Sequence, residues 1–499
     1  MLEKLLQFKE YLKKIEYMNS ATSVLYWDMR VGIPSKGIPY RGEVLGYLAG
    51  ETYKLQTSET MKGFIEYFSG LQNLDKITEA MVLKAKKDYD QTKKIPEKRY
   101  IEYTVLVSKA EAAWEDAKSK SDFSIFKPFL QEVVDFNKEL INYWGYKDNK
   151  YDTLLDFYEP GITVEKLDKV FGGLRTSIVK LLKKIQKSDM KPNNSMFTTG
   201  FSKEKQEAFG LFVLNKMGYD FEKGRLDESV HPFTIEFCNT DVRITTHYHE
   251  NDLKSALFGS IHEGGHALYE QDIPDSLQGT MLGHGVSMGI HESQSRFYEN
   301  ILGRSKAFWE YFYPQFKRTF PEFKEVSLED FYISMNEVKP SLIRIEADEL
   351  TYSLHIIIRY EIEKALINGE IEVEDLPKVW NSKYKEYLGV EPGNDAEGIL
   401  QDMHWSGGSF GYFPSYALGN LYGAQFLEKV LKDIPNFYKE IESGNLSHIH
   451  AWLKENIHKH GAIYTPSELI KMVTGEDLNE KYFIEYLNKK YCEIYKLNL

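Results

Sequence analysis

Apolar residues recur every three to four positions along most of the chain, the spacing of one buried face on an α-helix. Leu5, Phe8, Leu12 and Ile15, separated by charged residues, illustrate the pattern. It predicts long helices with one solvent-facing side. The expected helices cover residues 1–26, 40–68, 77–91, 97–117, 123–146, 252–271, 286–302, 328–335, 342–368 and 376–387, and further helices close the chain.

Only two segments alternate between apolar and polar residues in the manner of β-strands. They are His231–Phe237 and Asp241–Thr246, joined by a short loop typical of a hairpin. The glycine-rich segment Gly398–Gly423 interrupts the later helices, and no repeat or linker divides the sequence. The pattern predicts a mostly α fold with one small β-sheet, organised as a single domain over residues 1–499.

The expected helix 252–271 contains the sequence His262-Glu263-Gly264-Gly265-His266. Two histidines four positions apart project from one face of a helix and can bind the same Zn²⁺. The glutamate between them is placed to act as a general base on a water molecule. The alternative is a pair of ordinary core histidines.

Gly264 and Gly265 are unusual inside a helix, because each costs about 1 kcal/mol relative to alanine. We expect them where a strand or a substrate passes close to the helix backbone.

A catalytic zinc ion needs a third protein ligand and one open position. Glu270 is excluded, because His262 and Glu270 are separated by about 12 Å of helical rise. Glu292, in the next expected helix, is the candidate that completes a two-histidine, one-glutamate site. The alternative for Glu292 is a surface or salt-bridge residue.

Composition and charge exclude several classes of protein. The formal net charge is −13, and Lys and Arg are evenly spread, which argues against a nucleic-acid partner. No apolar run is long enough to span a bilayer, so we expect no membrane association. The two cysteines are too few for a disulfide framework, and the N-terminal segment has no signal-peptide character. We therefore expect a cytoplasmic protein.

The zinc motif is one of six short signatures spread over positions 231 to 405. They are His231-Pro232-Phe233, Asp241-x-Arg243-x-Thr245, His262-Glu263-x-x-His266, His291-Glu292-Ser293-Gln294, Ile343-Arg344-x-x-Ala347-Asp348 and Gly398-x-x-Gln401-Asp402-x-His404-Trp405. In sequence and order, these segments resemble the carboxypeptidase Taq family of metallocarboxypeptidases.

The resemblance implies a large helical zinc-peptidase fold with a deep substrate groove and the small β-sheet near the metal helix. Residues 1–220 would form a groove wall, and residues 221–499 would carry the zinc and substrate sites. It also implies a homodimer that removes single residues from the free C-terminus of peptides.

The implied catalytic centre holds one Zn²⁺ per chain, with Co²⁺ as a possible replacement. His262, His266 and Glu292 would be its ligands, and Glu263 would be the general base. The tetrahedral oxyanion needs a further donor. The candidates are His404, Tyr412 and Tyr416, and the alternative for each tyrosine is a place in the groove wall.

A carboxypeptidase must also bind a free carboxylate, for which a planar arginine side chain is suited. Arg344 is the first candidate and Arg243 the second, because the strand carrying Asp241 and Arg243 could also pair with an extended substrate. A structural salt bridge is the alternative for Arg243. Asp348, one turn from Arg344 on the same expected helix, would orient it. The other polar residues expected to bind substrate or orient ligands are Gln401, Asp402 and His291.

Two other functions are compatible with the sequence. One is an endopeptidase or a peptidyl-dipeptidase with the same zinc chemistry. The other is a non-catalytic helical binding protein with a structural zinc ion or none. A structural site would have four protein ligands, and the sequence offers only three.

Overall fold

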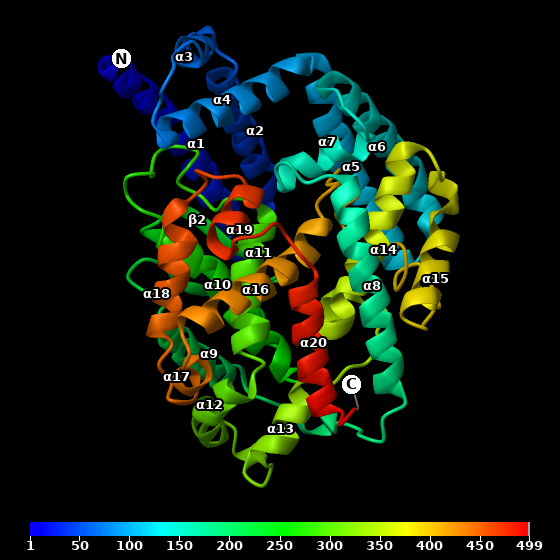
Figure 1. Cartoon of the computed structure of the whole chain (residues 1–499). Helices are drawn as coiled ribbons and strands as arrows, with labels where there is room; N and C mark the ends of the chain where they lie inside the picture. Colours follow the sequence, from blue (N-terminus) through cyan, green and yellow to red (C-terminus); the bar gives the residue numbers. More distant parts are fainter. Residues whose placement is uncertain (199, 498–499) are drawn as a thin grey trace. The chain divides into compact units, whose positions relative to one another are not determined.

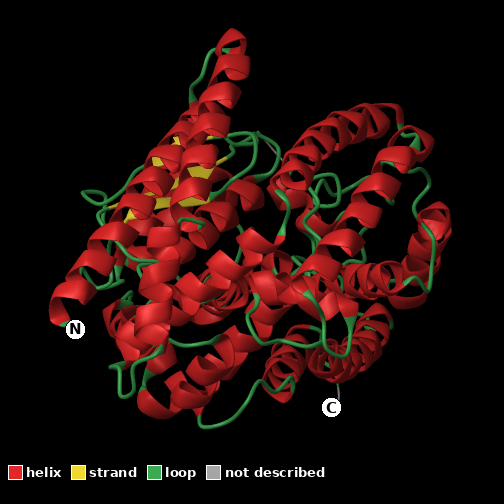
Figure 2. Cartoon of the chain, turned by 90° about the horizontal axis from the view of Figure 1, so that it is seen from above, coloured by secondary structure: helices red, strands yellow, loops and turns green. Residues whose placement is uncertain are grey.

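The structure is a computed structural model that describes residues 1–198 and 200–497. Its secondary structure is helical except for a small sheet, drawn in yellow in Figure 2. The predicted mostly α fold with one small sheet is therefore confirmed. The predicted single domain over 1–499 includes Thr199, Asn498 and Leu499, which lie outside the described residues, and it stays a prediction.

The described residues form two compact units, each built from three stretches of the chain. Unit 1 comprises Met1–Lys93, Asn193–Met335 and Phe426–Asp477, and unit 2 comprises the remaining described residues. Helix α16 (Pro414–Asp433) begins in unit 2 and ends in unit 1.

Unit 1 contains the small sheet, and its helices α1 and α10 pack against the strands (Figure 1). Its helices are α1 (Leu2–Val31), α2 (Ile38–Gln56), α3 (Glu59–Ser69), α4 (Lys76–Lys94), α9 (Lys203–Met217), α10 (Leu253–Gln271), α11 (Met288–Arg296), α12 (Lys306–Thr319), α13 (Leu328–Met335), α17 (Phe437–Glu442), α18 (Ser447–Asn456) and α19 (Pro466–Thr474). A π-helical turn, η3 (Phe297–Leu302), continues α11.

The sheet of unit 1 has the strand order β1-β3-β2. β1 (Leu226–Glu228) is parallel to β3 (Asp241–Thr246), and β2 (Thr234–Cys238) is antiparallel to it. Helix α10 packs against β2, β3, α9 and α11. These contacts place α10 in the interior of unit 1, and most of its side chains are buried.

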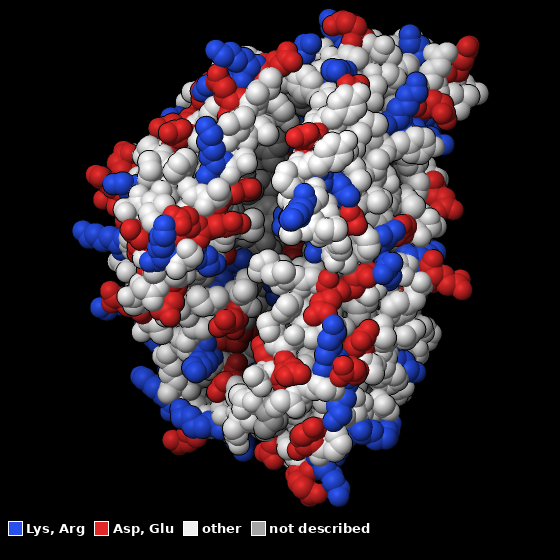
Figure 3. All heavy atoms as spheres, turned by 180° about the vertical axis from the view of Figure 1, so that it is seen from behind, with Lys and Arg blue, Asp and Glu red and all other residues white. Residues whose placement is uncertain are grey.

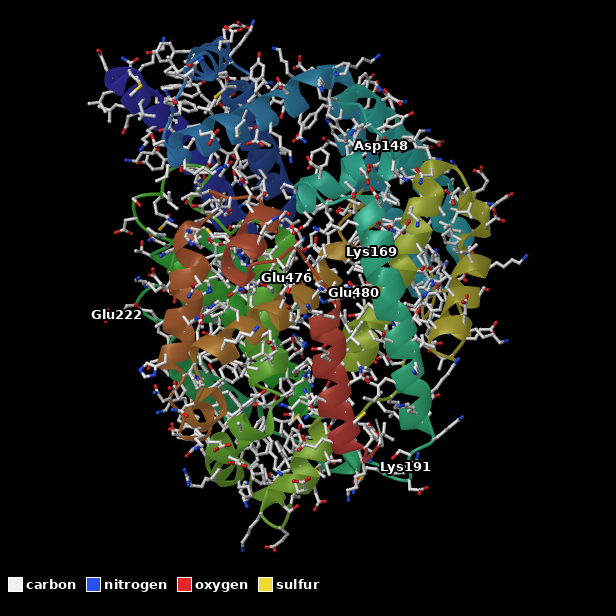
Figure 4. All side chains as sticks on the ribbon, viewed as in Figure 1. Asp148, Lys169, Lys191, Glu222, Glu476 and Glu480 are labelled. Atoms are coloured by element: carbon white, nitrogen blue, oxygen red, sulfur yellow. The ribbon has the colours of Figure 1, made fainter. Side chains whose placement is uncertain are left out.

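The described part of unit 2 has helices and loops but no strand, and α14 contacts α6, α7, α8 and α15. Its helices are α5 (Glu97–Lys120), α6 (Phe123–Trp144), α7 (Lys150–Tyr158), α8 (Val164–Gln186), α14 (Glu349–Asn368), α15 (Leu376–Tyr387) and α20 (Lys481–Ile494). Figure 4 shows the Glu480 side chain at the start of α20, where α20 packs against α8. A Cβ atom at Gly173 of α8 would lie only 2.7 Å from the Glu480 carboxylate.

Helix ends differ from the sequence predictions where capping residues intervene. The expected helix 40–68 is two helices, because Ser58 accepts a hydrogen bond from the Met61 amide and starts α3. The expected helix 342–368 was wrong at its start, because Asp348 caps a helix that begins at Glu349. The glycine-rich segment ends earlier than predicted, since α16 begins at Pro414.

The surface carries both signs of charge. On the face shown in Figure 3, lysine and arginine side chains are interspersed with aspartate and glutamate. Among the described residues, no helix combines the length and apolar character needed to cross a membrane.

Candidate functional site

The three predicted metal ligands lie together in unit 1. α10 places His262 and His266 one turn apart, and α11 brings Glu292 to them (Figure 1). Oε2 of Glu292 lies 3.7 Å from Nε2 of His262 and 3.5 Å from Nε2 of His266. Two tetrahedral ligands at about 2.1 Å from a zinc ion are about 3.4 Å apart. The three side chains therefore fit one divalent metal ion.

The two glycines of the motif allow close packing around α10. A Cβ atom at Gly265 would lie 2.7 Å from Cα of Ser295, in the backbone of α11. At Gly264 it would meet the ends of the Leu214 and Met217 side chains of α9. The expected close approach is real, but the neighbours are helices rather than the predicted strand or substrate. Gly265 therefore allows close contact between α10 and α11, the helices of the three candidate ligands.

His262 and Glu292 are held by a network of charged side chains from α11 and η3. Nδ1 of His262 lies 2.9 Å from Oε2 of Glu299, an arrangement that leaves Nε2 for a metal. Arg296 donates to Oε1 of Glu292 and to Glu299, at 2.7 and 3.1 Å. Glu299 and Arg296 are not among the predicted site residues. Their spacing of seven and four positions from Glu292 places them on one helical face, which was an available signal.

This network keeps Glu292 ionised. Burial alone would raise its pKa, but Arg296 and His262 lower the pKa to about 2. An ionised carboxylate is the form that binds a metal ion.

His266 is held differently, through a second histidine. Its Nδ1 lies 2.5 Å from Nδ1 of His291, whose Nε2 lies 2.8 Å from Oε1 of Glu270. Glu270 thus contacts His291, and it is not part of the three-residue ligand cluster.

The candidate general base Glu263 is buried beside the sheet. The Thr234 hydroxyl of β2 lies 2.6 Å from Oε2 of Glu263. Burial raises the pKa of Glu263 above its ordinary value. One carboxylate oxygen thus has a fixed partner, and a raised pKa suits a group that must accept and return a proton.

A second group of predicted residues meets in unit 2, around Asp402. Nε of Arg344 donates to Oδ1 of Asp402 at 2.9 Å, and Nε of Arg359 donates to Oδ2 at 2.7 Å. One carboxylate thus serves two guanidinium groups, which leaves one positive charge uncompensated within this trio. Arg359 is not among the predicted site residues. Its place in α14, the helix that follows Arg344 in the chain, was the only signal for it.

His404 and Tyr416 are paired in the same unit. Nε2 of His404 lies 3.2 Å from the Tyr416 hydroxyl, and Arg344 stacks on the Tyr416 ring at 5.0 Å. Tyr412 contacts both rings, with its centroid 5.5 Å from that of His404. Burial lowers the pKa of His404 to about 4, so the ring is neutral at neutral pH.

One supporting role in unit 2 differs from expectation. Asp348 does not orient Arg344, because Arg344 lies in a separate 3₁₀ turn and Asp348 caps α14. Asp402 pairs with Arg344 instead. Gln401 accepts from the Arg344 amide and from Arg359, at 3.0 and 2.7 Å. Its assignment to substrate binding is not tested by these contacts.

Arg243 and Asp241 form a two-pronged ion pair on β3, with both distances 2.8 Å. The Arg243 guanidinium also lies 4.6 Å from the Trp27 ring. The suggestion that this strand pairs with a substrate was wrong, because β1 and β2 occupy both of its edges. The geometry favours the structural alternative for Arg243.

One other histidine cluster in unit 1 has the residue types of a metal site. Oδ2 of Asp272 lies 2.7 Å from His450 and 2.9 Å from His458, and Lys454 lies 2.9 Å from Oδ1. These are hydrogen-bond distances, shorter than the separation of two metal ligands, and the lysine would repel a cation. We interpret the cluster as a salt-bridge network.

The chain is similar to known proteins over nearly its whole length. Residues 7–491 match the model of the family described as carboxypeptidase Taq (M32) metallopeptidase. "Carboxypeptidase 1" of Bacillus subtilis is 51% identical over 493 residues, covering 98% of each chain. "Thermostable carboxypeptidase 1" of Thermus thermophilus is 39% identical, covering 97% of this chain and 98% of the relative.

Solved structures show the same relationship. The crystal structure of the M32 carboxypeptidase from Deinococcus radiodurans R1 superposes with a TM-score of 0.96 at 34% identity, covering 99% of this chain and 100% of that one. The resemblance noted from the six signatures is confirmed. The chain belongs to the carboxypeptidase Taq (M32) metallopeptidase family.

Proposed function

We propose that this chain removes single amino acids from the free C-terminus of peptides, with one zinc ion held by His262, His266 and Glu292. The observation that carries the proposal is the convergence of these three ligands beside the buried Glu263. A bound divalent ion would polarise the scissile carbonyl and lower the pKa of a water molecule. Cobalt accepts the same ligand set and is the alternative metal.

Glu263 acts in this proposal as the general base. It accepts a proton from the attacking water and returns it to the leaving amine. The Thr234 hydroxyl fixes Oε2, which leaves Oε1 for the water. Burial of the side chain supports this role, because it raises the pKa of Glu263 and makes the carboxylate a better acceptor for the proton of the water molecule.

Arg344 is proposed to bind the terminal carboxylate of the peptide. What supports this role is the surplus positive charge of Arg344 and Arg359 over Asp402. Either His404 or Tyr416 is proposed to donate a hydrogen bond to the oxyanion, because the hydrogen bond between them uses one of their two protons. The His404–Tyr416 hydrogen bond favours Tyr416 over Tyr412 as the acting tyrosine.

We also propose self-association and a cytoplasmic location. Helix α2 has no buried side chain, and its Tyr40 and Tyr47 are 73% and 68% exposed. Exposed apolar side chains of this kind support a contact with a second copy. Two cysteines without a disulfide, Cys238 and Cys492, are consistent with a reducing compartment. Sedimentation of the purified protein tests the oligomeric state.

The decisive experiment compares a peptide with a free C-terminus and its C-terminal amide. We expect rapid release of single residues from the free acid and at least tenfold slower cleavage of the amide. Equal rates on the two peptides would instead indicate an endopeptidase. Products two residues long would indicate a peptidyl-dipeptidase.

A matched pair of arginine variants and a variant of Glu263 extend this test. Arg344→Met should reduce the preference for the free acid, whereas Arg243→Met should leave it unchanged, since Arg243 is paired within the sheet. Glu263→Gln should retain the metal and lose hydrolysis. Full activity in that variant would remove Glu263 from the mechanism and leave a binding function open.

A further inference from the structure

Glu270 is a buried carboxylate at the C-terminal end of α10, and the proposed reaction gives it no role. Its Oε1 atom accepts two hydrogen bonds, from Nε2 of His291 at 2.8 Å and from the amide of Gly285 at 2.9 Å. His291 in turn contacts the metal ligand His266. The three side chains form a continuous chain of hydrogen bonds within unit 1.

The protons of this chain can be assigned in order, because an ionised carboxylate only accepts hydrogen bonds. When a metal ion binds Nε2 of His266, Nδ1 of that ring carries the proton and donates, so Nδ1 of His291 is the acceptor and Nε2 of His291 donates to Glu270. Nε2 of His266 is left with its lone pair, on the side where Glu292 lies 3.5 Å away.

We propose that Glu270 is a positioning residue that selects, through His291, the metal-binding tautomer and orientation of His266. This inference rests on the proposed metal site. His262 is oriented directly by Glu299, whereas His266 depends on a relay of two side chains. Both arrangements serve the same purpose, since a metal-bound histidine needs a hydrogen-bond partner for its other nitrogen.

The surroundings hold the relay in place. A Cβ atom at Gly285 would lie 2.7 Å from Cδ2 of His291, so this position has no room for a side chain. The Tyr269 ring packs on His291 at 5.1 Å, and its hydroxyl accepts a hydrogen bond from the Val286 amide at 3.1 Å. The loop after α10 is thus connected to His291 through Glu270 and Tyr269.

Metal affinity tests this role without relying on catalysis. Zinc dissociation constants would be measured by competition with a chelating dye for wild type, Glu270→Ala and Glu270→Gln. We expect roughly 10- to 100-fold weaker binding for Glu270→Ala, the usual effect of losing such a partner. Glu270→Gln should recover most of the affinity, because its amide oxygen still accepts from His291.

The cobalt-substituted proteins provide a signature that a purely structural role would not change. At saturating Co²⁺, the visible absorption of Glu270→Ala should differ from wild type, and that of Glu270→Gln should resemble wild type. Glu349→Gln, which removes a buried carboxylate in unit 2, is the control and should change neither affinity nor spectrum. Thermal unfolding of the metal-free proteins identifies any variant that fails to fold.

Wild-type affinity and spectrum in both Glu270 variants would overturn the proposal. His266→Ala separates this failure from failure of the metal site itself. If His266→Ala also binds zinc as wild type does, the ligand assignment is wrong. If it loses zinc while Glu270→Ala does not, only the relay is wrong.

Discussion

Replacing Gly265 with alanine should separate α10 and α11, the two helices that carry the proposed metal ligands. The new Cβ atom would lie 2.7 Å from Cα of Ser295 and 2.8 Å from the carbonyl oxygen of Gln294. Both atoms belong to the backbone of α11, so no side-chain rotation can relieve the contact. The helix itself must move.

The size of the movement follows from the contact distance. Ordinary contacts of this kind begin at 3.4 Å, so the helices must part by the difference between 3.4 and 2.7 Å, about 0.7 Å. Glu292 lies one turn before Ser295 and moves with it. A shift of 0.7 Å is a third of a metal–ligand bond of about 2.1 Å. We expect zinc affinity to fall by about 10- to 100-fold, the range seen when ligands lose their support.

Stability should change less than affinity. Overpacking a well-packed site costs about 1 to 3 kcal/mol. Alanine recovers about 1 kcal/mol through its better helix propensity. The metal-free variant should therefore be less stable than wild type by roughly 0 to 2 kcal/mol.

Gly264→Ala is the matched control, one position away in the same helix. Its Cβ atom would meet Cδ2 of Leu214 and Cε of Met217, the movable ends of flexible side chains. We expect zinc affinity within about threefold of wild type and equal or higher stability, since helix propensity improves. Competition with a chelating dye and thermal unfolding of the metal-free proteins measure both quantities. Equal zinc affinity in the two alanine variants would refute the argument.

Three further predictions concern stability and metal content. Burial raises the pKa of Glu363 from about 4.5 to about 7, so the folded chain binds this proton more tightly than the unfolded chain. The contribution of Glu363 to the free energy of unfolding is therefore fully present at low pH and is lost as the pH rises from about 4.5 to about 7. One pKa unit corresponds to about 1.4 kcal/mol. The unfolding free energy of wild type, measured relative to that of Glu363→Gln, should therefore fall by about 3 kcal/mol from pH 4 to pH 8. A difference between the two proteins that stays constant with pH in denaturant titrations would contradict this prediction. Asp241→Asn should lower the unfolding free energy by at most about 1 kcal/mol in the same titrations, because the Asp241–Arg243 ion pair is partly exposed. The preference for free C-termini should not change. Chelation should abolish hydrolysis and lower the melting temperature, and zinc at 100 times its dissociation constant should restore about 2.7 kcal/mol of stability; a chelator-resistant enzyme would exclude the metal site.

Local signals predicted the metal helix well. The helix predicted over residues 252–271 is α10, and the Asp252 side chain caps its start by accepting a hydrogen bond from the Ser255 amide at 3.2 Å. The apolar residues at helical spacing predict a helix that ends at Gln271, and α10 ends there. Two histidines four positions apart need no tertiary information to share a face, which is why this part of the site could be predicted.

Other features depend on contacts between distant residues. β1 has three residues, and it is held by parallel pairing with β3, which no local pattern reveals. The partner of Arg344 was misassigned for a similar reason. Asp348 is near in sequence, but its carboxylate is used by the amides of α14, whereas Asp402 arrives from 58 positions away.

The charges around the candidate ligands suit a divalent ion. Four carboxylates are buried here, those of Glu263, Glu270, Glu292 and Glu299. Two guanidinium groups lie beside them, since Arg296 contacts Glu292 and Glu299 and Arg304 contacts Glu299. With the histidines in the neutral form that a metal ion requires, these groups carry a formal charge of −2. Buried charge is tolerated only when it is paired or coordinates a metal, so a doubly charged cation completes the balance. Neither arginine replaces that cation. Arg296 binds Oε1 of Glu292, and Oε2 remains directed at the two histidines.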